Sequence, residues 1–170
     1  MAKLKDKRGY RFVKELGGAI RRSTASFGAR WLVEQGYVKG RVLDFGCGFG
    51  YDADQNGWEA YDPYYRQGTI EGKFDTVICN HVLNMLTRAS REQTMRRIQE
   101  LLCEQGSAYL IVPRNIPVDG KVAMRKRIQN YVVLNLPSVY VDEKLEIYRL
   151  ESETQFSDTT NEIEQRLSRS

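Results

Sequence analysis

The pattern of hydrophobic and polar positions predicts short strands alternating with helices. Apolar runs of about four to eight residues bounded by turn residues are typical of strands, and continuous ones are typical of strands buried in a parallel sheet. Such runs lie at 41–45, 58–62, 74–80, 107–113, 131–136 and 145–150. The last two flank Pro137-Ser138, and we expect them to form a terminal antiparallel pair. The predicted fold class is therefore α/β, with a mostly parallel sheet.

Two stretches carry the signals of helices. Ser26 can cap a helix over Phe27–Gln35, with a glycine directly after it as the natural terminator. Ser90 and Gln93 have the spacing of a capping box, so we expect a second helix to begin there and to end at Gly106. The buried stripe of that helix is expected to comprise Met95, Ile98, Leu101 and Leu102.

The connections around the second strand are short. Only residues 51–57 separate Gly50 from that strand, whereas a parallel crossover normally takes a dozen or more residues. The first crossover is therefore either one short turn or the loop itself. The chain from Asp62 to Phe74 is also short, so we expect the usual third strand and its helix to be missing or rudimentary. The run at 74–80 then takes the place of the usual fourth strand. The sequence thus predicts a sheet that is abridged between the first strand, at 41–45, and this fourth strand.

Length and composition favour one globular domain. A chain of 170 residues can bury a substantial core. Cys47, Cys79 and Cys103 form no close-spaced metal or redox pair, so we expect no metal site, and free thiols in a reducing, cytoplasmic compartment. No apolar run has transmembrane length, and the charged start of the chain is unlike a secretory leader, so no membrane association is expected.

Charge is spread unevenly along a chain whose net charge is +4. Nine Lys and Arg residues lie between Lys3 and Arg30 against two acidic ones, and a second basic cluster comprises Lys121 and 125–127. We therefore divide the chain into a basic N-terminal extension (1–24), one domain (25–151) and a polar tail (152–170) that we expect to be mobile or loosely helical. The basic segments either attract a phosphate-bearing substrate or nucleic acid, or are solvated surface.

Residues 42–50, Val-Leu-Asp-Phe-Gly-Cys-Gly-Phe-Gly, are the most informative stretch of the chain. An apolar strand leads into Asp44 and then into three glycines at alternate positions, Gly46, Gly48 and Gly50. Glycines so placed allow a tight turn and let a ligand lie against bare peptide. Asp62 ends the second strand eighteen residues after Asp44, where an acidic residue holds ribose hydroxyls in open α/β sheets. The pattern predicts a nucleotide-like cofactor; the alternative is a tight turn that binds nothing.

The spacing of the glycines distinguishes between cofactors. Tyr51 stands where the dinucleotide fingerprint has its third glycine, and the G-x-G-x-G pattern preceded by Asp resembles motif I of class I S-adenosylmethionine (SAM)-dependent methyltransferases. The segments 44–48, 61–65 and 77–86 (VICNHVLNML) are similar to those of small stand-alone bacterial methyltransferases and of putative methyltransferases associated with DNA phosphorothioation. The resemblance covers about Ser23 to Leu150. It implies a Rossmann-like sheet, a terminal antiparallel strand pair and SAM as the methyl donor.

The resemblance also implies where the donor binds. The backbone of the loop from Gly46 to Gly50, Cys47 included, would approach it closely, and Asp62 would accept from both ribose hydroxyls. Tyr64 would lie against adenine or pack beside its neighbouring proline. Asp44 would orient the loop or bind the donor's ammonium group, and Asn80 would line the methionine end.

The acceptor side carries weaker signals. His81, the only histidine, follows Asn80 and has a pKa range that suits a general base. Arg114 and Ser26 are candidates for substrate binding, although a salt bridge and a helix cap are the plain alternatives. The residues after Cys79, Asn-His-Val-Leu, lack the prolines of enzymes that methylate exocyclic amines of bases, and Ile78 stands where a cytosine-C5 enzyme has proline. DNA base methylation is therefore disfavoured.

The sequence thus predicts a SAM-dependent methyltransferase whose acceptor is a small molecule or a nucleic-acid component. Methyl transfer needs mainly in-line alignment and exclusion of water, so the lack of a conspicuous catalytic dyad does not argue against an enzyme. The alternatives are a catalytically inactive SAM-binding regulatory module, a nucleic-acid-binding module on the same fold and, further off, a nicotinamide oxidoreductase.

Overall fold

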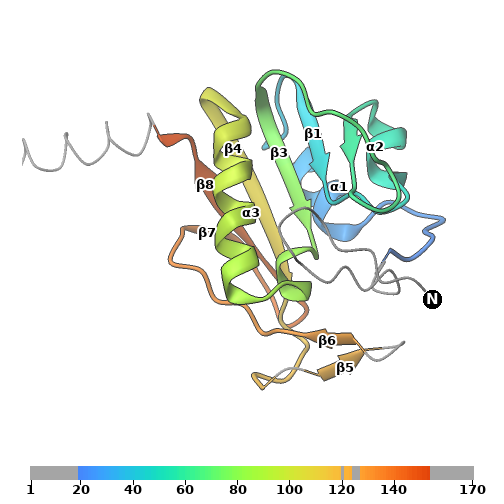
Figure 1. The fold of residues 1–170 in the computed structure, drawn as a ribbon, viewed down its shortest axis with the longest axis vertical. Coiled ribbons are helices and arrows are strands. Elements are labelled where there is room, and N and C mark those ends of the chain that lie inside the picture. Colours follow the sequence, from blue (N-terminus) through green and yellow to red (C-terminus); the bar gives the residue numbers. More distant parts are fainter. Residues whose placement is uncertain (1–18, 120, 124–126, 154–170) are drawn as a thin grey trace, which may run out of the picture.

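A six-stranded sheet runs through the part of the chain that the computed structural model describes, residues 19–119, 121–123 and 127–153 (Figure 1). Its strands follow the order β2-β1-β3-β4-β8-β7. The first four are parallel to their neighbours, and β8 and β7 are antiparallel. The strands are β1 (Val42–Phe45), β2 (Glu59–Tyr61), β3 (Phe74–Asn80), β4 (Leu102–Pro113), β7 (Ser138–Val141) and β8 (Leu145–Glu151). The predicted fold class is confirmed, and the sheet ends in an antiparallel strand pair, although one member of that pair differs from the predicted one.

Helices cover the two faces of the sheet because alternate strand residues point to opposite sides. On one face, Ile78 of β3 packs in a cluster with Leu32 of α1 (Phe27–Glu34). On the other face, Val77 and Cys79 pack with Ile98 of α3 (Arg88–Leu101). The short helices α2 (Tyr51–Asn56) and η2 (Leu83–Met85) follow β1 and β3 at their carboxyl ends.

The predicted first helix and the abridged sheet are both confirmed. Ser26 caps α1 by accepting a hydrogen bond from the backbone N–H of Ala29 at 3.2 Å. The first crossover contains the six-residue helix α2. Of the two predicted alternatives, a short turn or the loop alone, it corresponds to the short turn. The residues between Asp62 and Phe74 are all described and contain no named strand, so β2 is an edge of the sheet.

The boundaries predicted for the second helix were wrong at both ends. The helix α3 begins at Arg88 because Thr87 caps it, accepting the N–H of Ser90 at 3.3 Å. It ends at Leu101, and the next residue already belongs to β4. Gly106 therefore lies within a strand, where a Cβ would sit 2.7 Å from the carbonyl oxygen of Phe74. Close approach of the neighbouring strand, and not helix termination, requires this glycine.

The predicted terminal strand pair was only half right. The strand β8 was predicted, but its outer partner is β7, which starts after Pro137, and the segment 131–136 forms no strand. That segment is apolar because Val132, Leu134 and Leu136 pack against the core. A small hairpin of β5 (Lys121–Ala123) and β6 (Arg127–Gln129) was not predicted.

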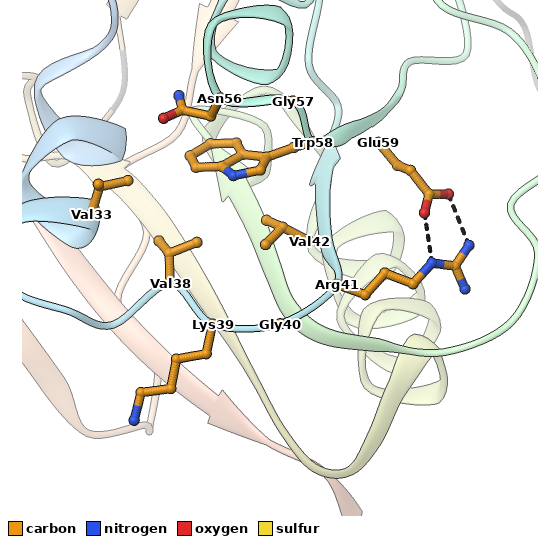
Figure 2. Close-up of a pocket in the computed structure, with 10 residues that line it drawn as sticks. All are labelled: Val33, Val38, Lys39, Gly40, Arg41, Val42, Asn56, Gly57, Trp58 and Glu59. Atoms are coloured by element: carbon orange, nitrogen blue, oxygen red, sulfur yellow. Dashed lines mark hydrogen bonds and ion pairs between the residues drawn. The ribbon is translucent and has the colours of Figure 1, made fainter.

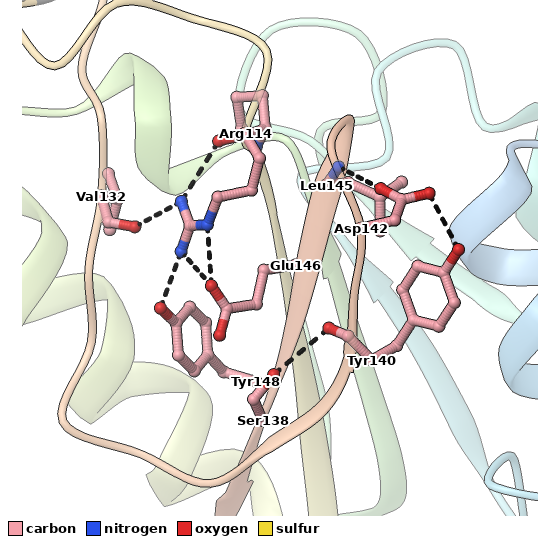
Figure 3. A network of polar contacts seen from close by, with 9 residues as sticks. Arg114, Val132, Ser138, Tyr140, Asp142, Leu145, Glu146 and Tyr148 are labelled. Carbon is pink, nitrogen blue, oxygen red and sulfur yellow. Dashed lines mark hydrogen bonds and ion pairs between the residues drawn. The ribbon is translucent and has the colours of Figure 1, made fainter.

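A polar network fastens the 131–136 segment to β8 (Figure 3). The Arg114 guanidinium, just after β4, forms an ion pair with Glu146 of β8 and donates to the hydroxyl of Tyr148 at 2.7 Å. It also donates to the carbonyl oxygens of Val132 at 2.9 Å and of Pro113 at 3.2 Å. All five N–H groups of the guanidinium therefore have acceptors. The side chains of Arg114 and Glu146 are only 8% and 15% exposed.

Replacing Arg114 by Ala is expected to destabilise the protein strongly. The change leaves Glu146 as an unpaired, largely buried carboxylate, and breaking such a pair costs about 3–5 kcal/mol. Arg88→Ala serves as the control, because the Arg88–Glu92 pair is exposed and should be worth less than about 1 kcal/mol. Urea unfolding of both variants measures the difference, and similar midpoints for the two would contradict this account of the network.

Candidate functional site

The glycine loop lies where β1 ends and α2 begins, at the carboxyl edge of the parallel strands. Gly46 has φ of 76° and Gly48 has φ of 58°, backbone conformations that glycine adopts at little cost. A Cβ on Gly46 would lie 2.4 Å from Val82, and one on Gly48 would lie 2.7 Å from Ala19. The loop is therefore bare peptide packed closely against its neighbours.

Most N–H groups of this loop already have acceptors. Those of Gly46 and Cys47 both donate to the carbonyl oxygen of Tyr61, at 2.7 and 3.1 Å. The N–H of Gly48 donates to Oδ2 of Asp62 at 2.9 Å, and that of Gly50 donates to the carbonyl oxygen of Cys47 at 3.0 Å. Because these four N–H groups already have acceptors, the loop can contact a ligand through its bare backbone surface but not through these donors.

Asp62 follows β2 and ties two loops together. Its Oδ2 accepts from Gly48, and its Oδ1 accepts from the N–H groups of Tyr64 at 2.8 Å and Tyr65 at 3.1 Å. A carboxylate has about four acceptor positions, so one remains for a ribose hydroxyl in this arrangement. The expected bidentate grip on both hydroxyls would require one backbone N–H to release the carboxylate.

Asp44 is buried beneath the loop, only 4% exposed, and no group among the described residues donates a hydrogen bond to it. Burial, together with the nearby carboxylates of Asp52 and Asp62, raises the pKa of Asp44 to about 7, although the charges of Arg22 and Arg66 oppose the shift. Negative groups are therefore gathered around one carboxylate to which no described residue donates a hydrogen bond. A cation-bearing ligand would supply the charge that is missing.

Residues 19–23 lie against the glycine loop. Ala19 faces Gly48, and the guanidinium of Arg21 lies over the ring of Phe49 at 4.3 Å. The hydroxyl of Tyr51 donates to the carbonyl oxygen of Ser23 at 2.9 Å. Residues 1–18 of the predicted basic extension lie outside the described residues. The part that is described belongs to the surroundings of the candidate site.

A chain of hydrogen bonds follows β3 at the same edge. The Asn80 amide donates to Oγ of Ser26 at 2.9 Å, and its Oδ1 lies 2.7 Å from Nδ1 of His81. The N–H of Ser26 donates to Oδ1 of Asp52 at 2.8 Å. Burial, together with the charge of Arg22, lowers the pKa of His81 to about 4, so the imidazole is neutral near pH 7.

The structure thus brings most of the predicted residues to one edge of the sheet. Tyr64 is 42% exposed and is accessible to a ligand. Cys47 contributes its backbone, because burial raises the pKa of its thiol to about 12. Cys79 is fully buried in the core. Arg114 is engaged in the β4–β8 network, so its predicted substrate contact stays a prediction beside an observed structural role, and so does that of Ser26, which caps α1.

Three charged residues of the site were not predicted from the sequence. Asp52 is the second residue of α2, and its position soon after the last glycine was the only signal for it. Arg22 belongs to the basic N-terminal cluster and was treated as part of the extension. Arg66 donates to the carbonyl oxygen of Phe49 and pairs with Asp54, contacts across a loop that sequence spacing does not reveal.

A hollow of about 410 Å³ lies elsewhere, at the amino ends of β1 and β2 (Figure 2). The ring of Trp58 lies between Val33, Val38 and Val42, with Lys39 below, and the ion pair of Arg41 with Glu59 is at one side. This hollow is at the opposite end of the strands from the glycine loop. No group of His, Cys, Asp and Glu side chains within the described ranges is arranged to hold a metal ion.

The comparison with family models identifies the family. Residues 12–152 match the model of a methyltransferase domain, a span that holds the glycine loop, Asp62 and the Asn80–His81 pair. The chain belongs to this methyltransferase-domain family. It is a SAM-dependent methyltransferase with a class I, Rossmann-like sheet, and SAM is its cofactor.

Solved structures share the fold of the methyltransferase at low sequence identity. The complex of DhpI with S-adenosylhomocysteine (SAH) superposes with a TM-score of 0.54 at 12% identity, over 74% of this chain and 83% of DhpI. The PH0226 protein of Pyrococcus horikoshii OT3 superposes with a TM-score of 0.51 at 14% identity, over 73% of this chain and 87% of PH0226. A third structure comes from work on the conversion of a disulfide bond into a thioacetal group during echinomycin biosynthesis. It superposes with a TM-score of 0.52 at 13% identity, over 84% of this chain and 86% of that protein.

No curated protein matches the chain. None of these comparisons bears on the similarity to methyltransferases associated with DNA phosphorothioation, which stays an expectation from the sequence. In the described part of the methyltransferase, no helix is both long and apolar enough to cross a membrane.

Gly46→Ala is expected to abolish stabilisation of the methyltransferase by SAM. The added Cβ meets Val82 at 2.4 Å and is held at a positive φ, so the loop must move. Gly36→Ala is the matched control, because Gly36 has φ of 72° with nothing within 4 Å of the added Cβ; it should cost about 1–2 kcal/mol and leave the SAM response intact. Thermal unfolding with and without SAM separates the two, and an intact SAM response in Gly46→Ala would contradict the proposed packing.

Asp44→Asn is expected to stabilise the protein at neutral pH. The raised pKa means that folded Asp44 keeps a proton that the unfolded chain loses, so its burial costs stability that grows from about pH 4 to pH 7. One pKa unit corresponds to about 1.4 kcal/mol, so the gain should reach several kcal/mol above pH 7 and vanish near pH 4.

Asp142→Asn is the control of opposite sign. Backbone N–H groups of Leu145 and Lys144 lower the pKa of Asp142, so its ionised form stabilises the fold and the substitution should cost stability at neutral pH. Urea unfolding between pH 4 and 8 measures both variants. If both variants change stability with pH in the same direction, the pKa of Asp44 is not raised in the folded protein.

Proposed function

We propose that this methyltransferase holds SAM in the crevice between the glycine loop, Asp44 and Asp62, and transfers its methyl group to a small molecule or a nucleic-acid component. One observation carries the proposal: Asp44 is a buried carboxylate that accepts no hydrogen bond from any residue in the described part of the chain, under a loop that offers bare peptide. SAM carries a sulfonium and an ammonium group, so it supplies positive charge to such a crevice.

The same charges argue against a dinucleotide. Asp44, Asp52 and Asp62 lie close enough for the latter two to raise the pKa of Asp44. A pyrophosphate placed among these carboxylates would be repelled. The helix after the loop, α2, also carries Asp52 and Asp54 in its first turn, where a phosphate would otherwise be favoured. A nicotinamide or flavin cofactor is therefore disfavoured by charge as well as by glycine spacing.

The residues present fit each end of the donor. The free acceptor position of Asp62 would bind a ribose hydroxyl, and the exposed ring of Tyr64 would lie against adenine. Asp44 would bind the ammonium group. Asn80 is at the carboxyl end of β3, the strand next to β1, and would line the methionine end. Bound SAM supplies a methyl group that is already activated by the sulfonium charge, so the protein's part is to align the acceptor and to exclude water.

The acceptor and the compartment are inferred from composition and from the state of the cysteines. The basic residues in 1–18 and 124–126 lie outside the described part of the chain, so a nucleic-acid acceptor is supported only by composition. Cys47, Cys79 and Cys103 are free thiols, which favours the cytoplasm as the compartment. A catalytically inactive module has no support from the family match.

Calorimetric titration with SAM, SAH and NAD tests the donor site. The wild-type protein should bind SAM and SAH, and NAD should bind at least about 100-fold more weakly. Asp62→Ala should weaken SAM binding by about tenfold or more, because one charge-assisted hydrogen bond contributes about 1.5–3 kcal/mol.

Asp142→Ala controls for the loss of a carboxylate that merely ties a turn. Asp142 accepts two backbone N–H groups, those of Lys144 and Leu145, and lies in the β7–β8 turn across the sheet from β2. It should leave SAM binding unchanged. Tighter binding of NAD than of SAM, or equal SAM affinity in Asp62→Ala and wild type, would refute the assignment.

A further inference from the structure

The Asn80–His81 pair holds an imidazole in one defined orientation beside the crevice. We propose that Asn80 and Ser26 fix the proton of His81 on Nδ1, so that Nε2 accepts a proton from the methyl acceptor. The acceptor is then methylated at an O–H or N–H group. This inference rests on the proposed function for the identity of the donor, and it adds the class of acceptor and two positioning residues, Asn80 and Ser26.

The direction of the hydrogen bonds fixes the proton. Oγ of Ser26 accepts from the N–H of Ala29 at 3.2 Å and from the Asn80 amide nitrogen at 2.9 Å. The oxygen of the Asn80 amide therefore faces His81, at 2.7 Å from Nδ1. An amide oxygen only accepts hydrogen bonds, so Nδ1 must be the donor and Nε2 carries the lone pair.

The backbone holds this arrangement at some cost. His81 has φ of 56° and is the only non-glycine residue with positive φ in the described part of the chain. Such a conformation is unfavourable for a side chain other than glycine and persists where the surroundings enforce it. Here the N–H of His81 donates to the carbonyl oxygen of Ile111 on β4 at 2.9 Å, while its ring turns back to the preceding side chain. Asp52 holds the other end of the series through the N–H of Ser26.

The imidazole lies at the same edge of the sheet as the proposed donor site. The strand β3 pairs with β1, with Ile78 opposite Asp44, so Asn80 and His81 follow the strand next to the buried carboxylate. The charge of Arg22 acts on both Asp44 and His81. Burial, together with the charge of Arg22, lowers the pKa of His81 to about 4, so the ring is neutral near pH 7 and its Nε2 lone pair is unprotonated. An imidazole with so low a pKa is a weak base, so proton transfer must accompany methyl transfer, when the attacking atom becomes positively charged and its proton acidic.

The proton and electron pairs balance as follows in the transfer. The acceptor atom forms a bond to the methyl carbon while the carbon–sulfur bond breaks, and sulfur keeps that electron pair. The acceptor's proton passes to Nε2 of His81, which becomes an imidazolium and later releases the proton to solvent. A thioether or a tertiary amine has no proton to give up, so the arrangement has no use for acceptors of that kind.

Nuclear magnetic resonance tests the tautomer directly, because His81 is the only histidine in the chain. Long-range ¹H–¹⁵N spectra of the full-length protein, purified without a polyhistidine tag, should show Nδ1 protonated and Nε2 bare. Asn80→Ala should move the ratio of tautomers toward Nε2–H by about fivefold or more. Asn80→Asp retains an acceptor and should keep the proton on Nδ1, a rescue that a merely structural role would not predict.

Ser26→Ala needs its own control because Ser26 also caps α1. Thr87→Ala removes the cap of α3 and should leave the His81 spectrum unchanged, whereas Ser26→Ala should alter it. An Nε2–H tautomer in the wild-type protein, or identical spectra for wild type and Asn80→Ala, would overturn the inference.

The acceptor class is tested with radiolabelled SAM and a fractionated cell extract. The labelled methyl group should appear on oxygen or nitrogen that previously carried hydrogen, and His81→Gln should lower the rate about 10²–10⁴-fold with SAM affinity changed less than twofold. A methyl group placed on a thioether sulfur or a tertiary amine would refute the inference. Failure of the wild-type protein to bind SAM would instead refute the proposed function, while the tautomer would still be decided by the spectra.

Discussion

The buried carboxylate of Asp44 is the constraint on which the site depends. A carboxyl group without donors beneath a packed loop is costly to ionise, and its pKa near 7 reflects that cost. The protein tolerates the cost because the position lies where β1 ends, beside Asp62 and below the glycine loop. Binding of a cation there favours the ionised form of Asp44. If SAM binds there as proposed, its binding is coupled to the release of a proton from the folded protein.

The sequence was sufficient for the fold class, and most of the residues that it named for the donor lie at one edge of the sheet in the structure. The periodicity of apolar residues located β1, β3, β8 and α1 within one or two residues, because each is governed by local pattern and by caps such as Ser26. The short connection after Gly50 correctly indicated a reduced crossover. The errors arose where tertiary contacts override local signals. Thr87 was the better cap than Ser90, and the apolar side chains of 131–136 serve packing without strand pairing.

The site residues that the sequence missed are those defined by contacts between distant segments. Ser26 and Asp52 are joined across 26 positions, and Asn80 reaches Ser26 across 54. Nothing in local spacing distinguishes Asp52 from an ordinary acidic residue in a first helical turn. The loop also differs from the expectation in its chemistry. Its glycines allow close packing because they have no side chain. The N–H groups of Gly46, Cys47 and Gly48 hold the loop to β2 and Asp62.

The edge position of β2 has a consequence for which groups the crevice encloses. No strand lies beyond β2 in the described sheet, and Asp62 and the exposed Tyr64 follow it directly. Asp44 and Asn80, by contrast, follow two interior strands that have neighbours on both sides. In the binding mode that we propose, the amino-acid end of SAM lies beside these interior strands and its purine beside the edge strand. In that mode, enlargement of the purine ring would extend into solvent, whereas bulk at the amino-acid end would meet protein.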